Sequence, residues 1–324
     1  MATYRGIQGY TVQKLSSDPT ASEDTAGQLW YNSTEGAWKI VSRGVGAWSS
    51  GGSLPAGIAQ QACIGTQTAG LSAFGDLDTP VTANANTYDG TSWTAVNAGT
   101  TARRNLAAAG IQTAGLAIGG TSPPGNKAQT EQYDGSTWTE TGDIPSARQG
   151  LGGAGTTTAA ISFGGGIGAG VATSDTFNGT SWTASNSLNN ARDNVGGGGA
   201  LAPDAMCAGG NTTTYTEKFD GTCWSEVGTL NASRNEAGVT MQGSSTAFLI
   251  FGDSQAPEGA LNEQFDGTSW TELSDLATAR ATRGCGTEVA ALCVGGALSS
   301  GGAHTDIVEE WNDPVYAIKT VTVS

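Results

Sequence analysis

A six-residue motif recurs along the chain at nearly constant spacing. It reads YDGTSW at 88–93, and related forms begin at Tyr133, Phe177, Phe219 and Phe265. Its tryptophan belongs to a series with steps of 42 to 46 residues: Trp48, Trp93, Trp138, Trp182, Trp224 and Trp270. A fixed period of this size is typical of folds that repeat one supersecondary unit. The period therefore constrains the fold more than any other feature.

Two further series keep the same period. An arginine follows five of the tryptophans by ten residues: Arg103, Arg148, Arg192, Arg234 and Arg280. An apolar run that ends in glycine occurs six times, for example LAIGG at 116–120. Trp311 in EEWN supplies the sixth aromatic at the first position of the six-residue motif. Each repeat then contains four short strands of ordinary length.

Six four-stranded units arranged around an axis predict an all-β fold, a six-bladed β-propeller. The 50 glycines fit this prediction, and 37% hydrophobic residues are enough for a core. We expect the glycine-rich runs at 151–155 and 195–199 to form innermost strands, where space is least. The tryptophans belong to outer strands and fill the wedge between neighbouring blades.

The order of the elements predicts how the ring closes. The strand around Trp48 has no inner strands before it, and the last repeat has no strand after Trp311. Pairing these two strands in the last blade removes two free sheet edges. We expect an N-terminal attachment segment with a hairpin at 1–44, the propeller at 45–312, and a C-terminal strand at 313–324 close to the N-terminal segment.

The recurring Asp-Gly pair predicts a two-residue hairpin turn in which both residues have positive φ. Asn178 takes the place of the aspartate in one repeat. A metal-binding or catalytic carboxylate would tolerate that replacement poorly, so the aspartate is interpreted as a turn residue.

The succession of Gly-Gly, Tyr-Asp, Trp and then Arg resembles the kelch repeat over roughly residues 45–312. The opening YTVQKLSSDPTASEDTAGQLWYNSTEGAWKIV, with TQTAGL at 66–71 and IQTAGL at 111–116, resembles tail and fibre-type virion proteins of marine bacteriophages. This second resemblance implies a structural virion component, made in the cytoplasm of a host bacterium, that contacts other virion proteins through its termini.

Several kinds of chemistry are disfavoured. A net charge of −15 argues against a nucleic-acid partner. The sequence contains no apolar run of 18 residues, which argues against insertion in a membrane. One histidine and five cysteines without metal-ligand spacing indicate no metal, no cofactor and no catalytic residue. The sequence leaves open whether Cys285 and Cys293 form a disulfide. It also leaves open a carboxylate pair for glycoside hydrolysis. The neighbouring acids Asp76 with Asp78, and Glu309 with Glu310, are interpreted as solvated surface.

The arginine series has two interpretations. Its guanidinium groups either join adjacent blades through carbonyls and acids, which strict repetition favours, or form a ring that binds an anion.

Recognition is expected in the loops that fail to repeat, since loops on a rigid scaffold commonly carry binding. The candidate residues there are Asp76, Asp78, Asn126, Lys127, Asn211, Glu258 and His304. The leading hypothesis is a non-enzymatic virion protein that recognises a host-surface glycan or protein. Capsid or tail decoration without receptor binding and a free lectin-like or protein-interaction propeller of a bacterium are the alternatives.

Overall fold

The computed structural model describes residues 13–255, 258–298, 302–313 and 316–322. Outside these residues lie the start of the expected attachment segment and parts of the expected C-terminal strand. Parts of two of the loops in which recognition is expected, at 253–262 and 297–306, lie outside them as well. The protein is all-β; the helical elements of the described part are three short 3-10 turns, η1 (Glu23–Thr25), η2 (Ala202–Asp204) and η3 (Glu258–Ala260). The chain divides into a repeat unit, Ala47–Asn312, and a terminal unit, Met1–Gly46 with Asp313–Ser324.

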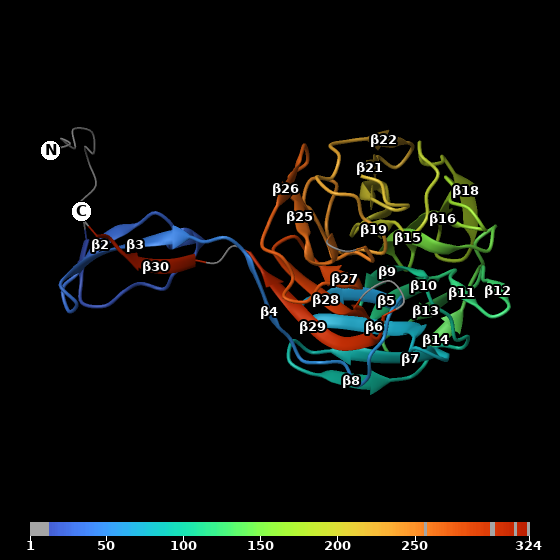
Figure 1. The fold of residues 1–324 in the computed structure, drawn as a ribbon, viewed down its shortest axis with the longest axis horizontal. Coiled ribbons are helices and arrows are strands. Elements are labelled where there is room, and N and C mark those ends of the chain that lie inside the picture. The colour runs from blue at the N-terminus through green and yellow to red at the C-terminus, as the bar shows by residue number, and fades with distance from the viewer. Residues whose placement is uncertain (1–12, 256–257, 299–301, 314–315, 323–324) are drawn as a thin grey trace. The chain divides into compact units, whose positions relative to one another are not determined.

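The described strands of the repeat unit form six four-stranded antiparallel sheets and one two-stranded ribbon (Figure 1). Sheet 1 contains β5 (Ala62–Thr66), β6 (Ala69–Asp76), β7 (Val81–Tyr88) and β8 (Trp93–Val96). Sheet 2 contains β9 (Ala107–Ile111), β10 (Ala114–Ile118), β13 (Thr130–Tyr133) and β14 (Trp138–Glu140). Sheet 3 contains β15 (Gln149–Thr156), β16 (Ala159–Gly166), β17 (Ser174–Phe177) and β18 (Trp182–Ser185).

The remaining sheets follow the same plan. Sheet 4 contains β19 (Gly196–Gly198), β20 (Met206–Ala208), β21 (Thr216–Phe219) and β22 (Trp224–Glu226). Sheet 5 contains β23 (Gly238–Val239), β24 (Phe248–Phe251), β25 (Asn262–Phe265) and β26 (Trp270–Glu272). Sheet 6 contains β27 (Ala281–Gly286), β28 (Ala290–Ala297), β29 (His304–Asn312) and β4 (Ala47–Ser50). The ribbon is β11 (Thr121–Ser122) with β12 (Gly125–Asn126).

Small residues let the first strands of the sheets approach one another closely. The first strands of consecutive sheets are in contact, from β5 through β9, β15, β19 and β23 to β27, and β27 also contacts β5. A Cβ atom built on Gly197 would lie 2.5 Å from the Cα atom of Gly152 on the neighbouring first strand. This arrangement is consistent with a propeller and gives the physical reason for glycine in these strands.

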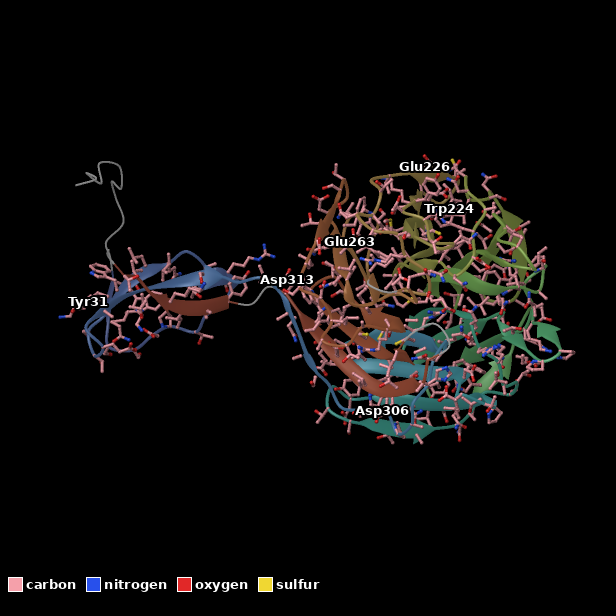
Figure 2. The ribbon with its side chains drawn as sticks, in the orientation of Figure 1. Tyr31, Trp224, Glu226, Glu263, Asp306 and Asp313 are labelled. Atoms are coloured by element: carbon pink, nitrogen blue, oxygen red, sulfur yellow. The ribbon has the colours of Figure 1, made fainter. Side chains whose placement is uncertain are left out.

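The tryptophans of the fourth strands lie between neighbouring sheets. Trp182 Nε1 in sheet 3 donates to Thr130 Oγ1 in sheet 2 at 3.0 Å, and Trp224 Nε1 in sheet 4 donates to Ser174 Oγ in sheet 3 at 3.1 Å (Trp224 is labelled in Figure 2). Each hydrogen bond satisfies a buried indole N–H while the ring fills apolar space, as aromatic side chains with one polar atom commonly do.

The strand around Trp48 lies where the order of the elements placed it. Strand β4 pairs antiparallel with β29, and Trp48 lies opposite Trp311. The centroids of these two rings are 5.5 Å apart, and Trp48 also packs edge-on against Phe251 of sheet 5.

The expected two-residue Asp-Gly turn is wrong. Tyr88 pairs with Trp93, so the loop contains four residues, 89–92. Within this loop Gly90 has positive φ, but Asp89 does not. The carboxylate of Asp89 instead accepts the N–H groups of Thr91 and Ser92 at 2.9 and 2.8 Å, and these bonds hold its pKa below the ordinary value.

This side-chain turn explains why asparagine serves in the same place. Asn178 Oδ1 accepts from the N–H groups of Thr180 and Ser181 at 3.0 and 2.9 Å. A carboxylate and an amide oxygen both accept such bonds, which are typical of Asp and Asn in turns. The position therefore needs an acceptor and no charge.

The terminal unit is one four-stranded sheet built from both ends of the chain. Its order is β1 (Gln13–Leu15), β2 (Leu29–Asn32), β3 (Ala37–Arg43) and β30 (Tyr316–Thr320). The carboxylate of Asp18 accepts hydrogen bonds from Asn32 Nδ2 at 2.7 Å and Trp30 Nε1 at 3.0 Å. Across the described residues of the whole chain, no helix is long and apolar enough to span a membrane.

The disulfide between Cys285 and Cys293 that the sequence left open does not form. All five cysteines are free, and Cys285 lies opposite Leu292 in the β27–β28 pair rather than opposite Cys293. Cys293 Sγ instead accepts from Arg280 Nη2 at 3.0 Å, and burial raises the pKa of its thiol to about 11.

Candidate functional site

Polar side chains from several sheets line a cavity of about 200 Å³ beside the first strands of the repeat unit. We call it the mouth cavity, and its polar lining comprises Gln60, Asp76, Arg104, Glu236, Thr282, Arg283 and His304. Gln60, Arg104 and Glu236 lie in the connections that lead into β5, β9 and β23, whereas Asp76 ends β6. The cavity thus collects residues that are far apart in the sequence.

Hydrogen bonds at and beside the mouth cavity connect sheets that are distant in sequence. Gln60 Nε2 donates to Glu236 Oε1 at 2.6 Å, and Arg283 Nη2 donates to Asn105 Oδ1 at 3.0 Å. Asn105 Nδ2 in turn donates to Asn194 Oδ1 at 3.1 Å. These partners are 89 to 178 residues apart, so this network forms only when the repeats are assembled.

The backbone that presents this network is unusual. Gln60, Asn105, Asn194 and Glu236 have φ angles of 55°, 53°, 52° and 57°. All four occupy the same repeat position, twelve residues after a tryptophan. Non-glycine residues in the left-handed region cost free energy and are concentrated at functional sites. The strain is therefore repeated where the polar network is built.

One ion pair and one histidine contact border the same cavity. Arg104 Nη1 donates to the carboxylate of Asp76, which is almost fully buried. His304 Nδ1 accepts the backbone N–H of Asp78 at 2.9 Å and lies 3.3 Å from its carboxylate. With Glu236 and Arg283, the lining carries both signs of charge, which suits a polar ligand with no large net charge.

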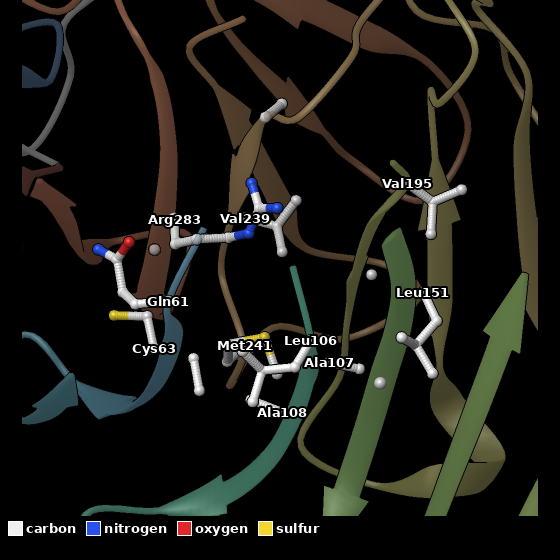
Figure 3. A pocket seen from close by; sticks show the side chains of 15 residues that line it. Gln61, Cys63, Leu106, Ala107, Ala108, Leu151, Val195, Val239, Met241 and Arg283 are labelled. Carbon is white, nitrogen blue, oxygen red and sulfur yellow. The ribbon is translucent and has the colours of Figure 1, made fainter. Parts of the chain in front are cut away.

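A smaller cavity of about 40 Å³ lies among the first strands (Figure 3). Its labelled side chains come from different sheets and include Gln61, Leu106, Leu151, Val195 and Arg283. Arg283 lines both cavities, the polar mouth cavity and this smaller, mostly apolar one.

The loop residues predicted from the sequence fall into separate places. The structure brings Asp76 and His304 together in the lining of the mouth cavity, and Asp78 contacts His304 beside it. Asn126 lies in β12 and donates to Gly166 O at 2.9 Å, and Lys127 follows it. Asn211 has a φ of 51°, and Glu258 begins η3. Asn126, Lys127 and Asn211 do not line the mouth cavity.

The prediction that the neighbouring acids form a solvated surface is wrong for two of them. Asp76 is 6% and Glu309 is 3% exposed, and both are paired with arginine. Each carboxylate is therefore held by a guanidinium rather than by water.

The five arginines of the repeating series are buried beside carboxylates. The pairs are Arg103–Glu131, Arg148–Asp175, Arg192–Glu217, Arg234–Glu263 and Arg280–Glu309 (Glu263 is labelled in Figure 2). Every one of these guanidinium groups is at most 1% exposed, so none presents a cationic ring to solvent.

Each arginine also links two sheets. The carbonyl of Arg148 accepts from Gly120 N of sheet 2 at 2.9 Å, while Arg148 Nε donates to Gly164 O of sheet 3 at 2.9 Å. Arg103 and Arg280 make the same Nε bond, to Gly119 O and Gly295 O. At Arg103, Arg148 and Arg280 the buried charge is thus surrounded by the acceptors that a guanidinium needs. Arg192 differs, because its Nε and Nη1 have no hydrogen-bond partner in the described part of the chain.

Sequence reasoning missed Gln60, Arg104, Glu236 and Arg283 at the mouth cavity, and it missed the acids that pair with the arginine series. The acids were detectable, because each lies two residues before the aromatic that ends a third strand or, in sheet 6, before Trp311. The mouth residues gave one signal: they lie just beyond the arginine position of their repeats.

Among the described residues no group of three or more His, Cys, Asp or Glu side chains could hold a metal ion. No protein-family model matches the chain, and no curated protein matches it.

Proposed function

We propose that the chain is a non-enzymatic structural protein of a bacteriophage virion, whose repeat unit recognises a glycan or protein on the host surface. In this proposal the repeat unit is a closed six-bladed, kelch-like β-propeller. The terminal unit attaches it to other virion proteins.

The junction between sheets 6 and 1 supports ring closure, because it carries the same hydrogen bonds as an internal junction. Gln67 Nε2 donates to the carbonyls of Trp311 and Ala291 at 2.5 and 3.2 Å. Gln112, one repeat later, donates to the equivalent carbonyls of Tyr88 and Gly70 at 2.7 and 3.0 Å.

The observation that carries recognition is the mouth cavity. It is polar, it departs from the repeat symmetry, and its side chains are held by bonds between distant repeats. Pre-organised polar groups with balanced charge suit the hydroxyl groups of a sugar, because few rotamers need to be ordered on binding. Attachment is supported by the terminal unit, in which strands from both chain ends pair in one sheet.

Binding of the full chain to host cells and to an array of their surface glycans tests this function. Arg104→Ala and Glu236→Gln should each weaken binding at least about tenfold, which corresponds to about 1.4 kcal/mol. Lys127→Ala, outside the mouth cavity, is the matched control and should bind normally. Wild-type binding by both cavity variants would remove the mouth cavity from recognition. A chain that is present in purified particles but binds no host component would be a decoration protein.

A further inference from the structure

Sheet 1 lacks the buried arginine–carboxylate pair that every other sheet of the repeat unit contains. The arginine position, ten residues after the tryptophan, is Ile58, and the acid position, two residues before the aromatic, is Asn86. Both partners of the pair are therefore replaced together. Loss of one partner alone would leave an uncompensated buried charge, so the paired replacement keeps this part of the sheet stable.

A cavity of about 310 Å³ lies where the pair would be, and we call it the sheet 1 cavity. Leu54 and Ile58 form its buried floor, at 4% and 6% exposed, with Leu77 and Val96 half-buried beside them. This volume is at the lower end of the range of ligand pockets, roughly 300–1,000 Å³.

The opening of this cavity is also uncharged. Ala95 lies at the rim and is exposed, whereas Glu140, Glu226 and Glu272 occupy the same position in sheets 2, 4 and 5. In a chain with a net charge of −15, this opening is free of the acids that its counterparts carry. An ionised ligand would lose its hydration here without gaining a partner of opposite charge.

Two amides provide the polar part of the lining. Asn84 and Asn86 are two residues apart on β7, and both line the cavity. Neither side-chain amide makes a hydrogen bond to the described part of the chain. The bonds of these two residues are made by their backbone groups. An amide offers both donors and an acceptor, so another amide can complement it through two hydrogen bonds.

We infer that the sheet 1 cavity binds the acetamido group of a neutral N-acetylated amino sugar. The methyl group would pack on Leu54, Ile58 and Val96, while the amide would exchange hydrogen bonds with Asn84 and Asn86. This site is separate from the mouth cavity and shares no lining residue with it. The inference concerns binding by the chain alone and does not depend on its presence in a virion.

Saturation-transfer NMR on the full-length protein tests the inference, with N-acetylglucosamine, glucose and O-acetylated glucose as probes. A ligand of this size should bind with a Kd of about 1 mM, and its acetamido methyl should receive the strongest saturation. Glucose should bind at least tenfold more weakly. The acetyl ester lacks the N–H donor and should fall between them.

Two variants locate the site. Ile58→Arg with Asn86→Glu restores the pair found in the other sheets, fills the cavity and should abolish binding. Ala95→Phe blocks the exposed rim without altering the core and should weaken binding at least tenfold. Its matched control is Ala184→Phe, at the same exposed position of sheet 3, which should bind as the wild type does.

Arg104→Ala separates the two sites, since it should impair the mouth cavity and leave N-acetylglucosamine binding unchanged. Equal saturation of glucose and N-acetylglucosamine, or unchanged binding by Ala95→Phe, would overturn the inference. Loss of host-cell binding in Arg104→Ala with retained sugar binding would still support both sites.

Discussion

Phe74 and Gly99 reverse the arrangement of a large and a small residue that the other five repeats share. This reversal makes a quantitative prediction. Phe74 occupies a position that is glycine in every other repeat, and it has a φ of 60°. Gly99 occupies the linker position that is Leu or Ile in the others, where Ile144 and Leu188 are buried. The ring of Phe74 fills the missing space: a Cβ on Gly99 would lie 2.3 Å from it.

The magnitudes follow from the contacts of Phe74. Its side chain is fully buried, packs edge-on against Trp138 at 5.0 Å and lies 4.4 Å beneath the Arg103 guanidinium. Truncating a buried phenylalanine costs about 3–5 kcal/mol, and release of the left-handed backbone returns about 1–2 kcal/mol. Phe74→Gly should therefore destabilise the protein by about 1–4 kcal/mol, or about 3–12 °C in Tm. Gly99→Leu alone should cost about 1–3 kcal/mol through overpacking.

The double variant Phe74→Gly with Gly99→Leu recreates the packing seen at Gly119 and Ile144. It should lie within about 1 kcal/mol of the wild type, so the coupling energy should be at least about 1 kcal/mol. Urea unfolding of the four proteins at one concentration measures this coupling. Phe74→Gly combined with Leu188→Ala, in a remote linker, is the control and should be additive. Additive effects of Phe74→Gly and Gly99→Leu would refute the equivalence of these repeat positions.

Two further predictions concern the repeated charges. Arg148→Ile should destabilise by about 3–5 kcal/mol because it leaves Asp175 buried and unpaired, whereas adding Asp175→Asn, the combination natural to sheet 1, should recover most of the loss in urea unfolding. A double variant no more stable than Arg148→Ile would contradict this. The turn carboxylates have pKa values lowered by backbone N–H bonds, so their stabilisation is present above pH 3.8, the unfolded value, and is lost as the pH falls through the lowered values. The four turn carboxylates are Asp89, Asp134, Asp220 and Asp266. Replacing all four by asparagine, as at Asn178, should make Tm depend less on pH at the acid end of the curve. An unchanged curve would exclude this role.

The strands were predictable because their aromatic residues recur at a fixed period, and the partner of Trp48 followed from the order of the elements. The turn type was not predictable from Asp-Gly alone, because the side chain of Asp89 replaces a backbone acceptor and lengthens the loop. The mouth cavity was also hidden, since Gln60 and Glu236 meet only after four intervening repeats have packed. The compensation of Gly99 by Phe74 was hidden as well, because the two residues lie 25 positions apart in the sequence. Departures from the repeat were thus more informative about the sites than the repeat itself.

The central claim is that this chain is a virion component whose repeat unit faces the host. Electron cryomicroscopy of purified phage particles tests this proposal most directly. The account predicts density for a six-bladed disc at symmetry-related positions, joined to the particle through the terminal unit and with the mouth cavity exposed. Particles that lack the protein, or that bury the mouth cavity against the virion, would contradict it.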